Sequence, residues 1–246
     1  MTPNVAPFSL TKNSQEAGEP LTPLFFLQTF QELASLHATE LGVSRSLLSK
    51  DKLAWMLHRL KVQFYKRPNP DRDIYFETYP SGFLRMLATR DYIARDHQGE
   101  IVVRATSSWL IANTEKRRAI PIPEWVQRRA PAYATPQLDL STRRIIERQK
   151  QMPTIAGLTV QETDIDFLEH VNNTRYAHWI LKYISEEFLK KHVLQELDIL
   201  FKSEAHLHDQ LQIELQQDAT VFSHRIRSAK SQAELIQAQT KWGPKS

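Results

Sequence analysis

The order of secondary-structure signals occurs twice in this chain of 246 residues, and this repetition restricts the fold more than any single motif does. In the first half, apolar residues recur every three to four positions over about 24–41, which predicts an amphipathic helix. Runs rich in Val, Ile, Phe, Tyr and Thr follow it, separated by segments that contain Asn, Pro or Gly. Each run predicts a β-strand, over 60–66, 73–79, 86–96 and 101–113.

The second half repeats this order. The last strand of each half places Ala and Trp four residues apart with a hydroxyl residue between them, at 105–109 and 238–242. A strand, a long helix and four antiparallel strands, written twice, predict an α+β fold and a pseudo-dimer within one chain. The helix is predicted over about 173–192, with one apolar face formed by Tyr176, Ile180, Tyr183, Ile184 and Phe188. The strands are predicted over 194–204, 210–216, 220–228 and 233–241.

A connector separates the two halves, so the predicted division of the chain is 1–118, 119–152 and 153–246. Four prolines in the connector predict an extended segment that is poor in helix. The stretch 114–152 is also basic, with nine Lys and Arg residues against four acids. A basic segment indicates an acidic partner (nucleic acid, a membrane surface or an acidic protein) or an ordinary solvated linker.

The composition excludes several kinds of site. The chain has no cysteine and therefore no disulfide, thiolate metal site or cysteine nucleophile. Gly-rich phosphate loops and a Gly-x-Ser-x-Gly elbow are absent from the sequence, and we expect no cofactor. No apolar run approaches the roughly 20 residues that cross a bilayer, and residues 1–19 lack the pattern of a secretory signal. We therefore expect a cytoplasmic protein.

The residues best suited to chemistry form a polar cluster ahead of the second helix. Asp164, Asp166 and His170 lie close together, and a carboxylate beside an imidazole can prepare the pair to activate water or accept a proton. Asn172 and Asn173 follow, and Asn is a good helix N-cap. The free N–H groups of a helix N-terminus can stabilise an oxyanion. Alternatively, Asp166 and Asn172 only cap the helix while His170 bonds a backbone carbonyl.

Glu204 stands at the end of the strand that is predicted directly after the second helix. That strand can return a carboxylate to the helix start, although a surface glutamate without a catalytic role is the alternative. His206 and His208, if they alternate on a strand, could join Glu204 or Asp209 in a weak candidate metal site. Because such histidines near a turn usually face solvent, we expect no metal.

Several motifs, in order along nearly the whole chain, now identify a resemblance. The second half contains Asp164-x-Asp166-x-x-x-His170-Val171-Asn172-Asn173-x-x-Tyr176-x-x-Trp179-Ile180-Leu181. The first half contains Leu53-Ala54-Trp55-x-Leu57-x-Arg59-Leu60, Arg104-Ala105-Thr106-Ser107-x-Trp109-x-x-x-Asn113, and Arg117-Arg118 followed by Ile122-Pro123. Together these motifs resemble the acyl-acyl carrier protein thioesterase family, the plant and bacterial enzymes that end fatty-acid synthesis.

The resemblance implies a tandem hot-dog fold, in which each half wraps an antiparallel sheet around a long helix. It also implies hydrolysis of a fatty acyl thioester on acyl carrier protein, with catalytic residues Asp166, His170 and Glu204. The Asn that family members carry between the Asp and the His falls on Leu168, and the Cys of many plant members falls on Ala205. Since leucine has no polar group, either a backbone amide or a group such as Asn172 replaces the missing amide, or activity is reduced.

The sequence thus predicts a thioesterase in which the N–H groups around Val171, Asn172 and Asn173 bind the thioester oxygen. Glu204 or Asp166 would activate water or attack directly. His170 would position the reacting groups or protonate the leaving thiolate.

Recognition is predicted to depend on charge, with the connector and the pair Arg117 and Arg118 attracting the acidic acyl carrier protein. An acyl-coenzyme A thioesterase is the chief alternative, and Leu168 motivates a second one, an acyl-binding protein without turnover. A nucleic-acid binder is disfavoured because the basic segment lacks interleaved aromatic residues for stacking. Both a monomeric pseudo-dimer and a homodimer remain open. Candidates to line an acyl pocket, or simply the core, are Phe26, Phe30, Trp55 and Leu57.

Overall fold

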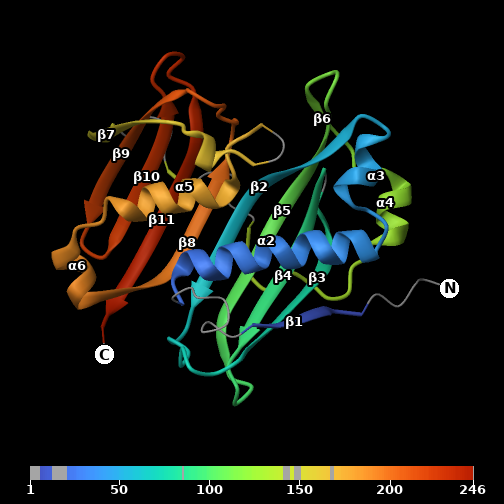
Figure 1. Ribbon diagram of the computed structural model, residues 1–246, viewed down its shortest axis with the longest axis horizontal. Coiled ribbons are helices and arrows are strands. Elements are labelled where there is room, and N and C mark those ends of the chain that lie inside the picture. The colour runs from blue at the N-terminus through green and yellow to red at the C-terminus, as the bar shows by residue number, and fades with distance from the viewer. Residues whose placement is uncertain are drawn as a thin grey trace. The chain divides into compact units, whose positions relative to one another are not determined.

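The computed structural model describes residues 6–12, 21–84, 86–140, 145–146, 151–166 and 169–245 (Figure 1). The chain divides into two compact units, residues 1–140 and 141–246. Each unit has a helix and antiparallel strands of its own. Within these described ranges, no helix is both long enough and apolar enough to cross a membrane.

The first unit pairs its strands antiparallel throughout the described residues. Its strands are β1 (Phe8–Lys12), β2 (Leu53–Phe64), β3 (Ile74–Leu84), β4 (Leu87–Arg95), β5 (Ile101–Asn113) and β6 (Arg118–Ile120). Its helices are α2 (Pro23–Glu40), α3 (Arg45–Ser49) and α4 (Glu124–Arg129). The strand order is β1-β3-β4-β5-β2, and β6 pairs with the C-terminal end of β5. The four strands and the helix predicted for this half are therefore confirmed, and β2 begins earlier than its predicted start.

Helix α2 begins where its sequence dictates. The Thr22 side chain accepts a hydrogen bond from the Phe25 N–H (3.3 Å), and Pro23 occupies the first turn, where its missing N–H costs nothing. The apolar face of α2 then packs on the sheet. The Phe30 ring lies 6.0 Å from the Phe76 ring on β3 and 4.9 Å from the Tyr92 ring on β4. Burial of these aromatic rings stabilises this helix–sheet layer.

The second unit follows the same plan. Its strands are β7 (Thr154–Thr159), β8 (His192–Phe201), β9 (Gln210–Asp218), β10 (Val221–Ser228) and β11 (Glu234–Pro244). Its helices are the 3₁₀ turn η1 (Glu162–Asp164), α5 (Asn173–Lys182) and α6 (Glu186–Lys191). The order β7-β9-β10-β11-β8 matches β1-β3-β4-β5-β2 strand for strand, with a helix after the first strand of each unit. The prediction of one α+β unit written twice is confirmed.

The repeated Ala and Trp positions are accompanied by the same side-chain hydrogen bond in both units. The Trp109 indole N–H on β5 donates to the Ser107 hydroxyl (2.7 Å), and the Trp242 indole N–H on β11 donates to the Thr240 hydroxyl (2.9 Å). In both units, therefore, a tryptophan near the end of the last long strand is bonded to the hydroxyl two residues before it. This bond identifies Ser107 and Thr240 as equivalent positions of the repeat.

One prediction about helices is wrong. The single helix expected over 173–192 is two helices, because α5 ends at Lys182 and α6 starts only at Glu186. The Ser185 hydroxyl accepts from the Phe188 N–H (3.3 Å), and this cap starts the second helix in a new direction. In the described part of the connector, the short helix α4 is the one helix, and the prolines stand just before and after it rather than inside it.

The connector is held on the first unit by a buried carboxylate. Asp91 is fully buried on β4, and its Oδ1 accepts hydrogen bonds from the Thr106 hydroxyl and the Gln137 N–H. The Leu138 N–H donates to the same Thr106 hydroxyl (3.0 Å), and Arg59 donates to the Leu140 carbonyl (3.3 Å). These bonds attach residues 137–140 to β2, β4 and β5, and no local sequence pattern predicts them.

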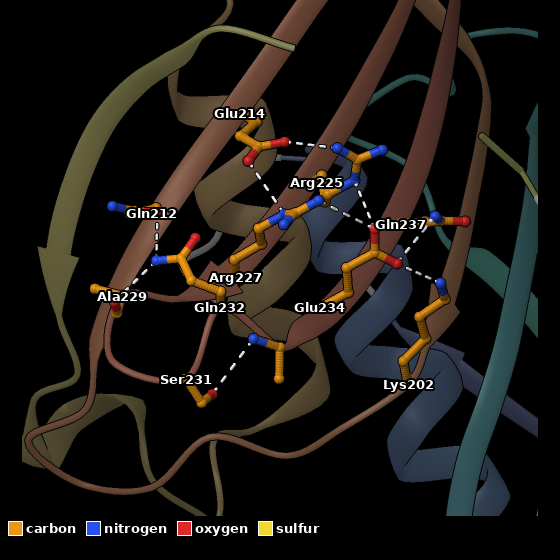
Figure 2. A network of polar contacts seen from close by, with 11 residues as sticks. Lys202, Gln212, Glu214, Arg225, Arg227, Ala229, Ser231, Gln232, Glu234 and Gln237 are labelled. Carbon is orange, nitrogen blue, oxygen red and sulfur yellow. Dashed lines mark hydrogen bonds and ion pairs between the residues drawn. The ribbon is translucent and has the colours of Figure 1, made fainter. Parts of the chain in front are cut away.

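A network of ion pairs ties four strands of the second unit together (Figure 2). Arg225 on β10, whose side chain is 2% exposed, lies between Glu214 of β9 (2.8 Å) and Glu234 of β11 (3.0 Å). Glu234 also pairs with Lys202, which follows the end of β8. Burial alone would raise the pKa of Glu234, but Lys202, Arg225 and the neighbouring Arg227 together lower it. The network thus fixes the first residue of the loop that follows β8.

Candidate active site

The polar cluster of the sequence lies at the N-terminus of α5, as predicted. The Asn172 side chain is the N-cap and accepts a hydrogen bond from the Thr174 N–H (2.9 Å). Before it, Asp164 is buried with a side chain 5% exposed, and it forms an ion pair with Arg175 on α5 (Nε–Oδ1 2.6 Å). The Asp164 carbonyl also accepts the Asn172 N–H (2.9 Å). Asp164 therefore fastens the incoming chain to the helix.

The segment between these anchors is a tight turn. The Asp166 N–H donates to the His170 carbonyl (2.8 Å), and Ile165 forms a bridge with Val171. Glu169 adopts a left-handed conformation, with φ of 65°, which lets the chain reverse within so few residues. The turn brings Asp166 and His170 opposite each other. Leu168, the position at which the resemblance places an Asn, lies outside the described residues.

Ala205 joins this turn to the loop that follows β8. The Val171 N–H donates to the Ala205 carbonyl (3.1 Å), and the Ala205 N–H donates to the Tyr176 hydroxyl on α5 (3.1 Å). Tyr176 is buried, and burial, with the nearby carboxylates of Glu204 and Asp209, raises the pKa of its hydroxyl. The hydroxyl is therefore a neutral hydrogen-bond partner at physiological pH. The backbone N–H and the carbonyl of Ala205 are both hydrogen-bonded. These bonds fix the position of the residue that precedes it.

That residue is Glu204, and it faces His170. Its Oε1 lies 3.4 Å from Nδ1 of His170, and the two side chains are 42% and 34% exposed. The His206 ring lies edge-on to the His170 ring, with 5.1 Å between ring centres. Glu204 therefore lies near the start of α5, where the sequence places a returning carboxylate. It lies in the loop after β8 rather than on the strand, because β8 ends at Phe201. An accessible acid–imidazole pair can exchange a proton with water.

Hydrogen bonds within the protein reduce the number of predicted oxyanion donors that a substrate could use. The N–H groups of Val171 and Asn172 already donate to Ala205 and Asp164, so neither is available to a substrate. Within the described ranges, the Asn173 N–H has no acceptor, and it stands at the first position of α5. Of the three residues proposed from the sequence, Asn173 alone keeps a free donor at the helix start.

The candidate metal ligands do not form the strand that was predicted for them. His206 and His208 lie in the loop between β8 and β9, because the Asp209 carboxylate accepts the His206 N–H (2.9 Å) and closes a turn there. His208 has a left-handed backbone, with φ of 69°, so the alternation expected of a strand is lost. No group of three or more His, Asp or Glu residues suited to a metal ion occurs in the part of the chain that the structure describes.

The candidate carrier-binding residues lie in the first unit. Arg117, in the turn after β5, and Arg118, the first residue of β6, are exposed, next to the exposed Lys116. Farther along the connector, Arg128 forms an ion pair with Glu124 (2.6 Å) and is partly neutralised. The connector cations 143, 144, 148 and 150 lie outside the described residues. Among the described cations of 114–152, Lys116, Arg117 and Arg118 thus form one exposed run.

Sequence reasoning missed two residues that hold the site together. Arg175 fixes Asp164, and the Tyr176 hydroxyl fixes Ala205. Tyr176 was assigned only to the apolar face of the helix, and its hydroxyl gave no signal in the sequence. Arg175 sits beside it in the same motif, but its partner can be identified only from the fold.

Comparison with known proteins identifies the family. Residues 21–128 match the model of the acyl-ACP thioesterase N-terminal domain, and residues 147–244 match the model of the acyl-ACP thioesterase C-terminal domain. The chain belongs to the acyl-ACP thioesterase family. The order of the two matches agrees with the two structural units and with the resemblance carried by the sequence motifs.

Plant proteins are among the curated relatives of this acyl-ACP thioesterase family member. A chloroplastic acyl-[acyl-carrier-protein] hydrolase of Cuphea viscosissima is 25% identical over 242 residues, which cover 89% of this chain and 57% of the relative. A chloroplastic oleoyl-acyl carrier protein thioesterase of Arabidopsis thaliana is 27% identical over 195 residues, which cover 73% of this chain and 53% of the relative. The chain thus spans a little over half the length of these relatives.

Solved structures confirm the fold of the thioesterase family member. The 12:0-ACP thioesterase from Umbellularia californica has a TM-score of 0.83 at 23% identity and covers 97% of this chain and 98% of its own. An acyl-ACP thioesterase from Bacteroides thetaiotaomicron has a TM-score of 0.79 at 18% identity and covers 97% of both chains. The expected tandem hot-dog fold is confirmed.

Proposed function

We propose that this protein hydrolyses the thioester of fatty acyl-acyl carrier protein to a free fatty acid and the carrier protein. The observation that carries the proposal is the contact between His170 and Glu204 at the N-terminus of α5. Membership of the acyl-ACP thioesterase family and the names of the plant relatives support the choice of thioester. This reaction would end fatty-acid synthesis by releasing the finished chain.

The residues would share the chemistry as follows. Glu204 takes a proton from water, whose oxygen attacks the thioester carbonyl carbon, and the Asn173 N–H stabilises the oxyanion that forms. As the C–S bond breaks, protonated His170 gives its proton to the leaving thiolate. The proton held by Glu204 then passes across the 3.4 Å contact to His170, which restores both groups. Water supplies the oxygen of the acid and both protons of the products.

Asp166 would act on His170 rather than on water. The turn that joins its N–H to the His170 carbonyl fixes the backbone of both residues. The Asp166 side chain would then orient the His170 ring for proton transfer to the leaving thiolate. A role for Asp166 as the water-activating base or nucleophile is the alternative within the same reaction.

The carrier protein would approach the exposed cations of the β5–β6 turn. Lys116, Arg117 and Arg118 form a compact positive surface, and charge complementarity with an acidic partner accelerates association. A free acyl-coenzyme A substrate would use this surface less, because it is smaller and reaches the active-site residues directly. The cytoplasmic location and the oligomeric state stay predictions from the sequence.

The decisive experiment compares two thioesters of equal chain length. Purified protein is mixed with dodecanoyl-acyl carrier protein or dodecanoyl-coenzyme A, and release of free thiol is followed. We expect a higher kcat/KM for the carrier-protein thioester. A higher value for the coenzyme A thioester would favour the acyl-coenzyme A alternative, and tight binding of both without release would favour an acyl-binding protein.

A further inference from the structure

Arg90 is a buried arginine on the helix-facing side of the first unit. It lies on β4 and is only 9% exposed. Its Nη1 donates two hydrogen bonds, to Nδ1 of His37 on α2 (3.0 Å) and to the Thr78 hydroxyl on β3 (3.2 Å). These contacts fix the guanidinium between the helix and the sheet.

Neither of these acceptors carries a negative charge. The Thr78 hydroxyl gives its own proton to the Asp91 carbonyl (2.8 Å), so it meets Arg90 with a lone pair. Burial and the nearby charge of Arg90 lower the pKa of His37 to about 4, so the ring is neutral at physiological pH. No carboxylate pairs with Arg90 in the described part of the chain, and the Asp91 side chain is engaged with the connector. A buried charge without a counter-ion is costly to the fold.

The repeat shows that the fold itself does not require this charge. Ser107 lies opposite Arg90 in the β4–β5 pairing, and its equivalent Thr240 lies opposite Phe222 in the β10–β11 pairing. Phe222 is therefore the counterpart of Arg90 in the second unit. It is buried, and its ring packs against Phe188 with 4.9 Å between ring centres. An apolar side chain fills this position where only packing is needed.

The unused edge of the guanidinium has the geometry of an anion receptor. Both Nη1 protons of Arg90 are taken by His37 and Thr78, while Nε and Nη2 have no partner among the described residues. Neither nitrogen belongs to the fully enclosed polar atoms that lack a partner, so both keep an open side. The Nε–Nη2 edge presents two parallel N–H groups, which match the two oxygens of a carboxylate.

Aromatic rings lie next to His37, the partner of Arg90, and next to Tyr92 on the same strand as Arg90. Phe8 stacks on His37 with 5.6 Å between ring centres, and Phe30 lies 4.9 Å from Tyr92, two residues after Arg90 on the same strand. Aromatic rings offer contacts to an alkyl chain and none to a hydrated inorganic anion. We propose that Arg90 binds the carboxylate of an alkanoate, that is, a carboxylate group on an alkyl chain, inside the first unit.

Two molecules can supply this carboxylate. One is a free fatty acid bound by its head group, and the other is an acyl thioester whose far end carries a second carboxylate. The shared recognition element is the carboxylate in the Nε–Nη2 fork. The proposal rests on the geometry of the first unit alone and does not depend on the hydrolysis proposed for the second.

Isothermal titration calorimetry of the full chain with decanoate and with decan-1-ol tests the proposal. These ligands have chains of equal length and differ in the carboxylate, so the wild-type protein should bind decanoate more tightly. Arg90→Gln should weaken decanoate binding by about tenfold to a hundredfold, the effect of losing hydrogen bonds to a charged group, and leave decan-1-ol unchanged. Arg95→Gln, on the same strand and at the surface, is the matched control and should change neither ligand.

Folding of the variant is checked by thermal unfolding, and we expect Arg90→Gln to fold because it removes an uncompensated charge. A third ligand, the S-pantetheine monothioester of decanedioic acid, separates the two sources. Arg90-dependent binding of decanoate supports a free fatty acid, and Arg90-dependent binding of the monothioester alone supports an acyl chain with a far carboxylate. Equal affinity of wild-type protein for decanoate and decan-1-ol, with no gain for the monothioester, would overturn the proposal, and so would equal tight binding of inorganic phosphate.

Discussion

Nδ1 of His170 lies 3.4 Å from Oε1 of Glu204. The two residues lie in different loops, with α5, α6 and β8 between them in the sequence. One loop precedes α5, and the other follows β8. Ala205 holds them together through one hydrogen bond to Val171 and one to Tyr176. The acid–imidazole pair is thus positioned by the backbone of a residue that has no functional group in its side chain.

Loss of either member of this pair should slow hydrolysis strongly. Glu204→Gln and His170→Asn each remove a proton-transfer group, so kcat for dodecanoyl-acyl carrier protein should fall by about 10²–10⁴-fold. If the two residues act as a unit, the double variant should lose little more than either single variant. The measurement is the initial rate of thiol release.

Glu187→Gln is the matched control for this pair, because Glu187 is exposed on α6 and forms a surface ion pair with Lys191 (3.6 Å). Its kcat should equal that of the wild type. Full activity of Glu204→Gln would remove Glu204 from the mechanism and leave Asp166 as the candidate base.

Tyr176→Phe should affect catalysis through the loop that carries Glu204. The variant keeps the ring but leaves the buried Ala205 N–H without its acceptor, which costs about 1–3 kcal/mol of folding free energy. The loop then loses one of its two anchors, so kcat should fall while KM changes little. Urea unfolding and steady-state kinetics measure the two effects. Tyr183→Phe, at the end of α5, is the control, and identical kinetics of both variants would contradict a positioning role.

Much of the fold was predictable because its signals are local. The three-to-four spacing of apolar residues predicts α2, and the Val- and Ile-rich run of residues predicts β5. The break after α5 was not predictable from that spacing. Phe188 keeps the helical phase, while the Ser185 cap that starts α6 competes with continuation by only one hydrogen bond.

The candidate site was predictable in its residue types but not in its hydrogen bonds. Asp166, His170 and Glu204 carry groups whose chemistry is visible in the sequence. The backbone groups of Ala205 and Val171 carry no such signal, because every residue has them and only the fold decides which ones meet. For the same reason, the sequence could not show that two of the three candidate oxyanion donors are already occupied.

Asp164 and Arg175 should stabilise the second unit through their ion pair. Asp164→Asn removes a buried charge that also accepts the Gln161 N–H (2.9 Å), so the free energy of unfolding should fall by about 1–3 kcal/mol. A double-mutant cycle with Arg175→Gln, measured by urea unfolding, isolates the pairwise energy. The exposed pair of Glu187 and Lys191 supplies the comparison, with little expected coupling. A cycle energy near zero for Asp164 and Arg175 would show that the pair is not coupled.

Recognition of the carrier protein should depend on the cations of the β5–β6 turn. Arg117→Glu combined with Arg118→Glu should raise KM for the carrier-protein thioester and leave kcat unchanged, because these residues would guide association rather than chemistry. KM of the wild type should also rise with salt, since screening weakens long-range attraction. Arg72→Glu, an exposed charge reversal in the loop before β3, is the control. A wild-type KM that does not change between low and high salt would contradict this prediction.

Acid should destabilise the protein through His37 and His224. His224 is fully buried, its Nε2 bonds the Thr240 hydroxyl (2.9 Å), and burial lowers its pKa to about 3. Since an unfolded histidine has a pKa near 6.5, the unfolded chain binds a proton that the folded chain rejects, so stability falls as the pH drops below about 6.5. Each such histidine contributes a slope of up to about 1.4 kcal/mol per pH unit, which urea unfolding at pH 7, 6 and 5 can resolve.

His224→Gln should remove one such contribution, whereas His97→Gln, an exposed control, should keep the wild-type slope. Equal slopes in the wild type and His224→Gln would mean that His224 is protonated without loss of the fold.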